Sequence, residues 1–201
     1  MFAELLQQKL SGIISLAPQQ LQLLEAHYQL LVRWNRVLNL TTVTSLEEAI
    51  ERHYCESLFL AMQLPPDPLQ ILDIGSGAGF PGFPVAVLRP DCTVILLESH
   101  ARKAVFLREA ARNRENVQVR ALRGEDLTET FECAISRAVS YRDLAPILKK
   151  IGRRADLLTG VEEPPAELGF AWKDPIQLPW GRQRFLRTGV PRETLDHFRF
   201  T

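Results

Sequence analysis

Apolar positions in the first third of the chain recur with helical spacing. One face of a predicted helix carries Leu21, Leu24, Tyr28 and Leu31, which are three or four residues apart. Pro18 precedes this stripe and suits the first helical turn, where a missing backbone N–H costs no hydrogen bond. We therefore expect an amphipathic helix that begins near residue 18.

A second helix is predicted to begin after Ser45. Ser45 and Glu48 match the S-x-x-E pattern of a capping box, in which each side chain bonds a backbone N–H of the other residue. The prolines of segment 65–68 cannot continue a helix and predict a stiff linker. The apolar stripe between these signals consists of Leu46, Ile50, Tyr54 and Leu58.

Beyond the linker, short apolar runs alternate with helical stretches. This alternation predicts a parallel sheet with helices on both faces. The predicted strands are 71–74, 93–97, 116–122, 134–136 and 156–159, followed by two in the tail, near 172–178 and 183–189. The predicted helices lie near 82–89, 101–113 and 141–151.

The length of 201 residues favours one structural domain, with a helical N-terminal extension at 1–64 packed on a core at 69–201. The chain has 24 Lys and Arg against 24 Asp and Glu, so its net charge is zero. A protein coated in positive charge is excluded, and contact with nucleic acid must come from a local patch.

The three cysteines form no C-x-x-C pair, which gives no support for a zinc cluster and suits a reducing compartment. The N-terminus lacks the apolar run of a signal peptide, and no segment approaches the length of a membrane helix. We expect a cytoplasmic monomer with no metal and no membrane association.

The stretch 71–84, ILDIGSGAGFPGFP, carries the strongest chemical signal. A predicted strand runs into Gly75, Gly77 and Gly79, and a helix follows. Glycines let the backbone turn sharply and approach a ligand, and the free N–H groups of the helix start point toward it. In a doubly wound sheet, this turn borders the crevice where cofactors bind.

The register of the glycines distinguishes between cofactors. A dinucleotide fingerprint that begins at the strand end, at Gly75, would need its third glycine where Phe80 stands, and no G-K-[ST] follows for a P-loop. The register that fits is D-x-G-x-G-x-G, which begins at Asp73. It resembles the first motif of class I S-adenosyl-L-methionine methyltransferases, in which the acidic residue faces the cationic methionine part of the cofactor.

Acidic residues follow the next two predicted strands. Glu98 ends the second strand, where a carboxylate can accept hydrogen bonds from both ribose hydroxyls of either kind of cofactor. We also predict that Ser99, the next residue, belongs to the cofactor-binding residues. The segment 124–126, which contains Gly124 and Glu125, follows the third strand and can reach the adenine ring.

Five segments together resemble the bacterial 16S ribosomal RNA guanine-N7 methyltransferases, also called the glucose-inhibited division protein B family. The resemblance covers roughly residues 25–160. The segments are WNRVLNLT (34–41), RHYCESL (52–58), ILDIGSGAGFPGFPVAVLRPD (71–91), LLES…RKAVFLRE (96–109) and ISRAV (135–139).

The resemblance implies a Rossmann-like class I methyltransferase fold, S-adenosyl-L-methionine as cofactor, and a guanine of 16S rRNA in the small ribosomal subunit as substrate. It implies that Gly75 and Phe80 line the cofactor turn and that Arg137 faces the carboxylate end of the cofactor or the guanine. The fifth strand ends at Thr159, where the family usually has a lysine. A methyltransferase acting on a protein or small molecule, and a non-catalytic RNA-binding module, remain alternatives.

Asn39 and His53 are candidate substrate residues in the first two of these segments. Trp34 can stack on a base, but packing in a helical core is the favoured interpretation. For His53, too, the favoured interpretation is structural, because a lone histidine on a helix is more often a hydrogen-bonding core residue than a catalyst.

Basic residues gather in three places: 102–123, 149–154 and 182–199. Segment 102–123 has seven Arg or Lys against two Glu. Each cluster is either a solvated face or a phosphate-facing side.

Overall fold

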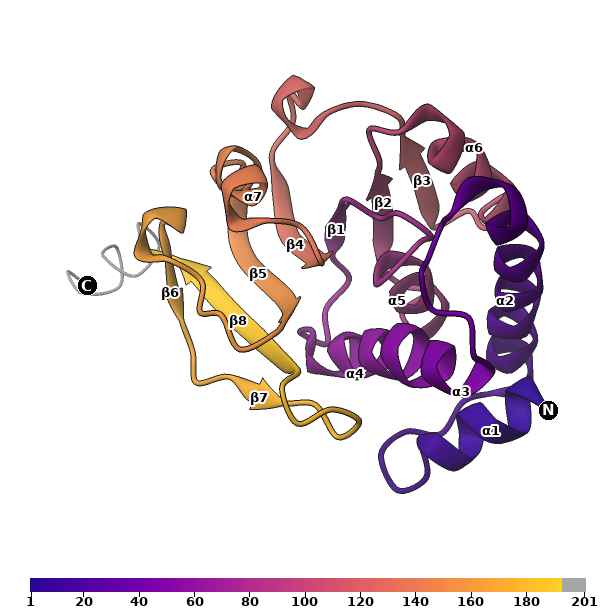
Figure 1. The fold of residues 1–201 in the computed structure, drawn as a ribbon. Coiled ribbons are helices and arrows are strands. Elements are labelled where there is room, and N and C mark those ends of the chain that lie inside the picture. The colour runs from indigo at the N-terminus through magenta and orange to yellow at the C-terminus, as the bar shows by residue number, and fades with distance from the viewer. Residues whose placement is uncertain (193–201) are drawn as a thin grey trace.

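Parallel strands form the centre of the molecule (Figure 1), in a computed structural model that describes residues 1–192. Within these residues an eight-stranded sheet runs in the order β3-β2-β1-β4-β5-β8-β6, and β7 pairs with β8. The first five strands of this order are parallel, while β8 is antiparallel to β5 and β6. The sheet is therefore mostly parallel and doubly wound. Its strands are β1 (Gln70–Ile74), β2 (Thr93–Leu97), β3 (Val117–Arg120), β4 (Phe131–Arg137), β5 (Ile151–Thr159), β6 (Phe170–Trp172), β7 (Ile176–Gln177) and β8 (Phe185–Pro191).

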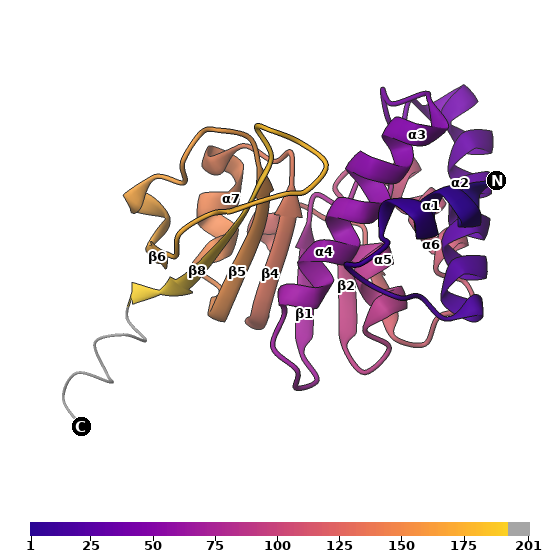
Figure 2. The same cartoon turned by 90° about the horizontal axis from the view of Figure 1, so that it is seen from below.

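Helices cover both faces of the sheet (Figure 2). Alternate residues of β1 point to opposite faces, so Ile71 enters the core under the N-terminal helices and Leu72 enters the core under α7. Because both faces are buried, the central strands are continuous apolar runs. The helices are α1 (Phe2–Lys9), α2 (Pro18–Leu38), α3 (Leu46–Ala49), α4 (Glu56–Gln63), α5 (Gly82–Leu88), α6 (Ala101–Ala110) and α7 (Tyr141–Leu148).

The N-terminal helices pack on the core. Helix α2 contacts α5 and α6, and α4 contacts α5. Leu24 and Leu31 of α2 are buried as the stripe predicts, but Tyr28 is only half-buried, and His27 takes the fully buried position beside it. The side chain of His27 lies against Phe83 at the start of α5, with ring centroids 4.3 Å apart.

The helix predicted after Ser45 differs from a regular α-helix. It contains a π-helical segment, Ile50–Cys55, between α3 and α4. The Ser45 hydroxyl accepts the Glu48 N–H as expected, but the Glu48 carboxylate pairs with Arg52 at 2.6 Å instead of returning to Ser45. Only half of the predicted capping box forms, because an arginine one turn later competes for the carboxylate.

Several element boundaries also differ from the sequence prediction. The strand predicted at 172–178 is divided between β6 and β7, because Pro175 lacks a ladder donor. Helix α7 ends at Leu148, and β5 begins at Ile151, five residues before the predicted strand. Helix α1 was not predicted. The other predicted strands and helices are present within a few residues of their expected bounds.

A buried ion pair joins the extension to the tail. Glu56 of α4 is 1% exposed and accepts two hydrogen bonds from Arg184, at 3.0 and 2.6 Å. Two parallel N–H···O bonds compensate a carboxylate for the loss of water. The pair fixes the segment before β8 against α4.

Arg184→Met should therefore lower the free energy of unfolding by about 3 kcal/mol, because it leaves a buried carboxylate without its partner. Urea unfolding at pH 7 measures the change. The matched control is Arg182→Met, two residues away on an exposed position. An equal, small effect of the two variants would contradict this assignment.

Candidate functional site

A cavity of about 420 Å³ lies where the strand order changes direction, between β1 and β4. This is the position at which open α/β sheets bind ligands. Its volume falls within the range of small-molecule pockets. The lining comes from the loops after β1, β2, β3 and β4 and from α7, and includes Gly75, Ser99, Leu122, Gly124, Val139 and Asp143.

The turn after β1 holds bare backbone at this cavity. Gly75, Gly77 and Gly79 have φ values of 71°, 55° and 90°, in the left-handed region that L side chains rarely adopt. A Cβ on Gly75 would lie 2.5 Å from a methyl group of Val139. The backbone N–H groups of Gly75 and Ser76 both donate to the carbonyl of Leu97, which fixes the turn to the end of β2.

Glu98 lies directly behind this turn and is 7% exposed. Its two carboxylate oxygens accept the N–H of Gly77 at 2.9 Å and the N–H of His100 at 2.7 Å. Each oxygen retains a second lone pair, so the carboxylate can still accept hydroxyl hydrogens. Glu98 thereby links the glycine turn to the start of α6.

Asp73 is fully buried beneath the turn. One carboxylate oxygen accepts the N–H of Gly82 at 3.0 Å, which ties β1 to the first turn of α5. The other, Oδ1, has no hydrogen-bond partner among the described residues. Burial raises the pKa of Asp73 to about 7, because the loss of water outweighs the opposing effects of the nearby Ser76 hydroxyl and the Gly82 N–H.

The structure places the ten residues of the predicted cofactor set in four groups. Four of them line the cavity: Gly75, Ser99, Gly124 and Glu125. Gly77 and Glu98 form its edge through their hydrogen bond, while Asp73, Gly79 and Phe80 are buried under the turn. Arg137 is not among the lining residues, and its guanidinium bonds Arg52 and His53 of the N-terminal extension.

Two ionisable residues of the cavity lining, Arg123 and Asp143, are absent from the predicted cofactor set. Asp143 belongs to the first turn of α7, where Ser140 caps the helix by accepting the Asp143 N–H and donating to its carboxylate. A Ser-x-x-Asp pattern before an apolar run was a usable signal for that cap. The ionic side chains of the lining are two acids and one arginine, which favours a cationic ligand.

Arg137 joins the cavity side of β4 to the π-helical segment. Its guanidinium donates to the carbonyl of Arg52 and to Nδ1 of His53, the latter at 2.9 Å. It also lies over the ring of Phe80, 5.2 Å from the centroid. His53 stacks on the same ring at 4.6 Å. Residues from three segments of the family resemblance thus meet at one point.

The second ring nitrogen of His53 is hydrogen-bonded to the loop after α2. Thr41 Oγ1 lies 2.9 Å from His53 Nε2, and Asn35 holds Thr41 through both its backbone N–H and its carbonyl. Since arginine can only donate, Nδ1 of His53 must accept and Nε2 must carry the proton. This tautomer requires a neutral ring, and burial together with Arg137 lowers the pKa of His53 to about 3.

Trp34 and Asn39 lie apart from this network. Trp34 packs edge-on against Phe106, with ring centroids 5.8 Å apart, as the core interpretation predicts. Asn39 is exposed and ends α2 in a left-handed conformation with φ of 47°. His27 is a structural residue: its Nε2 donates to the carbonyl of Ala78, and its Nδ1 accepts from Tyr54.

In two of the three basic clusters, most cationic side chains form hydrogen bonds or ion pairs with other residues of the protein. In the cluster at 149–154, Arg154 pairs with buried Asp156 at 2.5 Å, and Arg153 pairs with Asp67 at 2.7 Å. In the tail, Arg184 pairs with Glu56, and Arg187 donates to Thr159 at 3.1 Å. Arg199 lies outside the described residues. Only the cluster at 102–123 keeps several exposed cations without such partners in residues 1–192.

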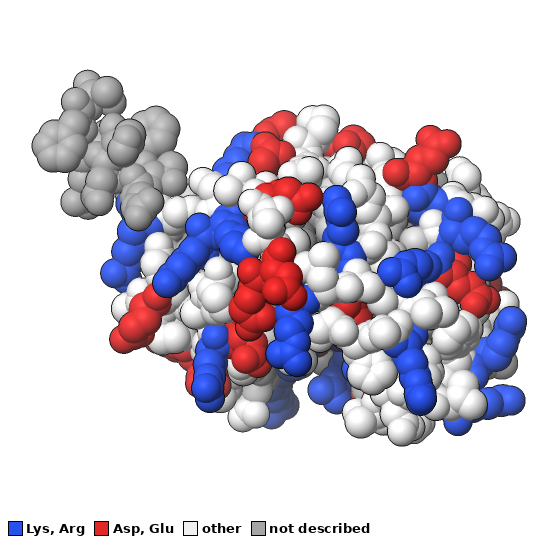
Figure 3. Space-filling view, turned by 90° about the horizontal axis from the view of Figure 1, so that it is seen from above, with Lys and Arg blue, Asp and Glu red and all other residues white. Residues whose placement is uncertain are grey.

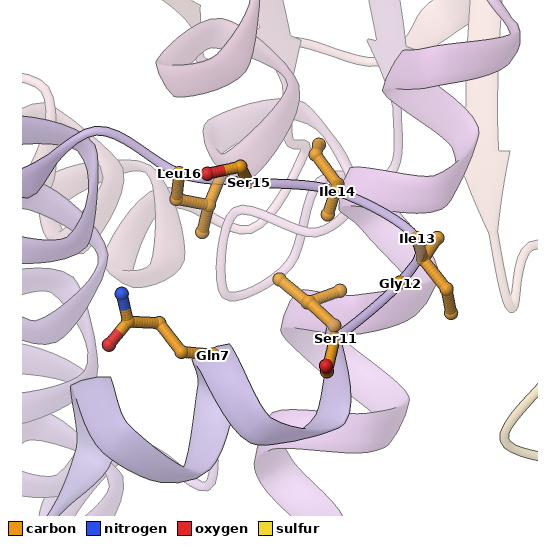
Figure 4. A pocket seen from close by; sticks show the side chains of 8 residues that line it. Gln7, Ser11, Gly12, Ile13, Ile14, Ser15 and Leu16 are labelled. Carbon is orange, nitrogen blue, oxygen red and sulfur yellow. The ribbon is translucent and has the colours of Figure 1, made fainter.

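A second cavity of about 420 Å³ curls around the turn between α1 and α2 (Figure 4). Its lining, residues 7 and 10–16, comes from one local segment and carries no ionisable side chain. It contains none of the predicted site residues. Across residues 1–192, no cluster of three metal-ligating side chains occurs, and no helix is long and apolar enough to cross a membrane.

Solved structures that share this architecture include methyltransferases. A methyltransferase from Pyrococcus furiosus has a TM-score of 0.57 at 15% identity, over 83% of this chain and 96% of that one. Fibrillarin from Aeropyrum pernix, in complex with S-adenosyl-L-methionine, has a TM-score of 0.53 at 16% identity, over 67% and 73%. The chain has the fold of the class I methyltransferases.

A family model of the rRNA small subunit methyltransferase G matches residues 20–158. The curated protein of that name from Dichelobacter nodosus is 46% identical over 119 residues, which are 57% of this chain and 56% of the relative. The one from Carboxydothermus hydrogenoformans is 36% identical over 183 residues, 80% of this chain and 77% of the relative. The chain belongs to this family. It spans 56% to 61% of the length of three other curated relatives.

The buried ionisable groups predict a pH dependence of stability. An unfolded histidine takes up a proton near pH 6.5, whereas His27 and His53 stay neutral until about pH 3. Unfolding takes up protons in that range, so acidification lowers the free energy of unfolding. Asp73 opposes this trend, because its folded pKa of about 7 lies above the unfolded value of 3.8.

Asp73→Asn removes the opposing contribution. Between pH 6.5 and pH 4.5 the variant should lose stability more steeply than the parent protein, by up to about 1.4 kcal/mol per pH unit. Urea unfolding at several pH values measures both slopes. Asp126→Asn, at an exposed aspartate, is the control. Parallel slopes for Asp73→Asn and the parent protein would show that Asp73 is ionised throughout.

Proposed function

We propose that this protein transfers a methyl group from S-adenosyl-L-methionine to N7 of one guanine in 16S rRNA, as free RNA or in the small ribosomal subunit. The observation that carries the proposal is the cavity at the β1–β4 switch point, bordered by a left-handed glycine turn and by Glu98. The family membership supports the substrate class.

The residues present fit this cofactor in three respects. Gly75 and Gly124 line the cavity, and a Cβ at either position would collide with another lining residue, Val139 at 2.5 Å or Ile147 at 2.0 Å, so a side chain there would disturb the cavity wall. The buried Asp73 Oδ1 has no partner among the described residues. Acidic side chains predominate around the cavity, which suits a sulfonium.

We assign the cofactor contacts by position in the fold. In this assignment Glu98 contacts the ribose, and Gly124 and Glu125 contact the adenine. Asp73 faces the cationic methionine end. The glycine turn with Gly77, Gly79 and Phe80 shapes the backbone between them, and Ser99 borders the cavity. Arg137 faces the carboxylate end or the guanine. In this proposal, residues 1–64 form an extension of the core at 69–201.

Little acid–base chemistry is required of the protein. The bound cofactor would supply an activated methyl group, and guanine N7 accepts it with an in-plane lone pair without first losing a proton. The protein then contributes positioning and electrostatics. A neutral His53, with a pKa of about 3, is consistent with this division: it holds Arg137 and takes up no proton near neutral pH. Asn39, exposed at the end of α2, is a candidate substrate contact.

Gly75→Val should lower the affinity for S-adenosyl-L-methionine by about 100-fold, because a branched side chain would overlap both Val139 and the cavity. Isothermal titration calorimetry measures the affinity. Gly169→Val is the matched control: Gly169 has a similar φ of 78° but open space around it, so it reports backbone strain alone. Unchanged binding by Gly75→Val would place the cofactor elsewhere.

The reaction itself is tested with methyl-labelled cofactor. The full chain is incubated with unmodified small-subunit rRNA, with small subunits lacking the modification, and with protein and metabolite fractions. Labelling of one guanine, lost after cleavage specific for 7-methylguanine, is the expected result. Label only in protein or metabolites would refute the RNA assignment. RNA binding without any transfer would favour a non-catalytic module.

A further inference from the structure

A groove of about 420 Å³ separates α2 from α6, away from the cofactor cavity. Its floor is apolar, with Leu23, Leu30 and Phe83. Its rim carries Arg33 on the α2 side and Arg112 on the α6 side. The charged side chains in the lining are three arginines and one glutamate, Glu109, so the groove is electropositive.

The basic side chains continue from the groove along α6. We define the α6 surface as the exposed residues Arg33, Arg102, Arg108 and Arg112. None of these four guanidinium groups has a hydrogen-bond or ion-pair partner within residues 1–192. By contrast, Arg153, Arg154 and Arg184 are paired with Asp67, Asp156 and Glu56. Figure 3 shows Lys and Arg spread over one face of the molecule, with Asp and Glu between them. The α6 surface is therefore a local positive patch on a protein of zero net charge.

The α6 surface leads away from the cavity. Helix α6 begins two residues after Ser99, which lines the cavity, and its ten residues span about 15 Å. The groove lies at the far end of this helix, beside Arg112. A ligand chain that carries a negative charge at every repeat can follow this line while one of its units reaches the cavity.

We propose that the α6 surface and the groove bind the phosphodiester backbone of the RNA substrate next to the methylated guanine. The proposal rests on the proposed function. Guanidinium groups pair with phosphate oxygens through paired N–H donors, and exposed arginines that lack protein partners are free to do so. Contacts to the phosphate backbone position a protein on a nucleic acid, so this patch would set the orientation of the RNA on the protein.

The test compares two triple variants with the same change in charge. Arg102→Gln/Arg108→Gln/Arg112→Gln alters the α6 surface. Lys149→Gln/Lys173→Gln/Arg182→Gln alters exposed cations near β5, β6 and β8, at the opposite end of the sheet. Binding of an unmodified small-subunit rRNA transcript is measured by filter retention at several salt concentrations. Calorimetry with S-adenosyl-L-methionine is run in parallel, and both variants should bind the cofactor as the parent protein does.

The α6 variant should bind the transcript at least about 10-fold more weakly at low salt, and the slope of log affinity against log salt should fall by about 2, since each lost phosphate contact removes about 0.7. The control should change neither value. Equal losses in both variants, or an unchanged slope, would overturn the proposal. So would competition by poly-glutamate as effective as competition by RNA, which would assign the patch to an acidic protein. A parent protein that binds cofactor but no transcript would instead refute the proposed function.

Discussion

The structure depends on the turn between β1 and α5, where three glycines hold left-handed backbone conformations. This turn needs glycine at Gly75, Gly77 and Gly79 because a side chain would be strained there, and at Gly75 would also overlap Val139. The N–H groups of the same turn hold it in place beside the cavity: those of Gly75 and Ser76 donate to the carbonyl of Leu97, and that of Gly77 donates to Glu98. Asp73 beneath it ties the strand to the next helix. Fold and site therefore share one constraint, and a change that relaxes it alters both.

Buried polar contacts connect the N-terminal extension to this turn. His53, bonded to Arg137 and stacked on Phe80, and His27, bonded to the carbonyl of Ala78, bring the extension to the underside of the glycine loop. Both rings are neutral at physiological pH because burial lowers their pKa values. A buried network of this kind is costly when it is only partly satisfied, so it specifies one arrangement of the two parts. The extension thus supports the site and does not merely cover the sheet.

Charge is distributed locally in this protein. Arg153, Arg154 and Arg184 pair with Asp67, Asp156 and Glu56, so they contribute to the fold. The cations of α6 stay exposed beside an apolar groove. A zero net charge conceals this division, because it sums paired and unpaired groups alike. Only the position of each partner in space separates a structural arginine from one available to a ligand.

The sequence by itself determined the order of strands and helices, the glycine turn and the acidic ends of the strands, because these follow from local periodicity and from the conformational freedom of glycine. The predicted bounds of β2 are the observed ones, and those of α5 differ from the observed bounds by one residue. It did not determine the π-helical segment, the orientation of Arg137 or the place of Asp143 in the cavity. Those depend on partners far away in the chain: Arg137 meets His53 across 84 residues, and Arg184 meets Glu56 across 128. Burial and pairing at such separations arise only when the sheet has brought the segments together, so tertiary structure alone decided them.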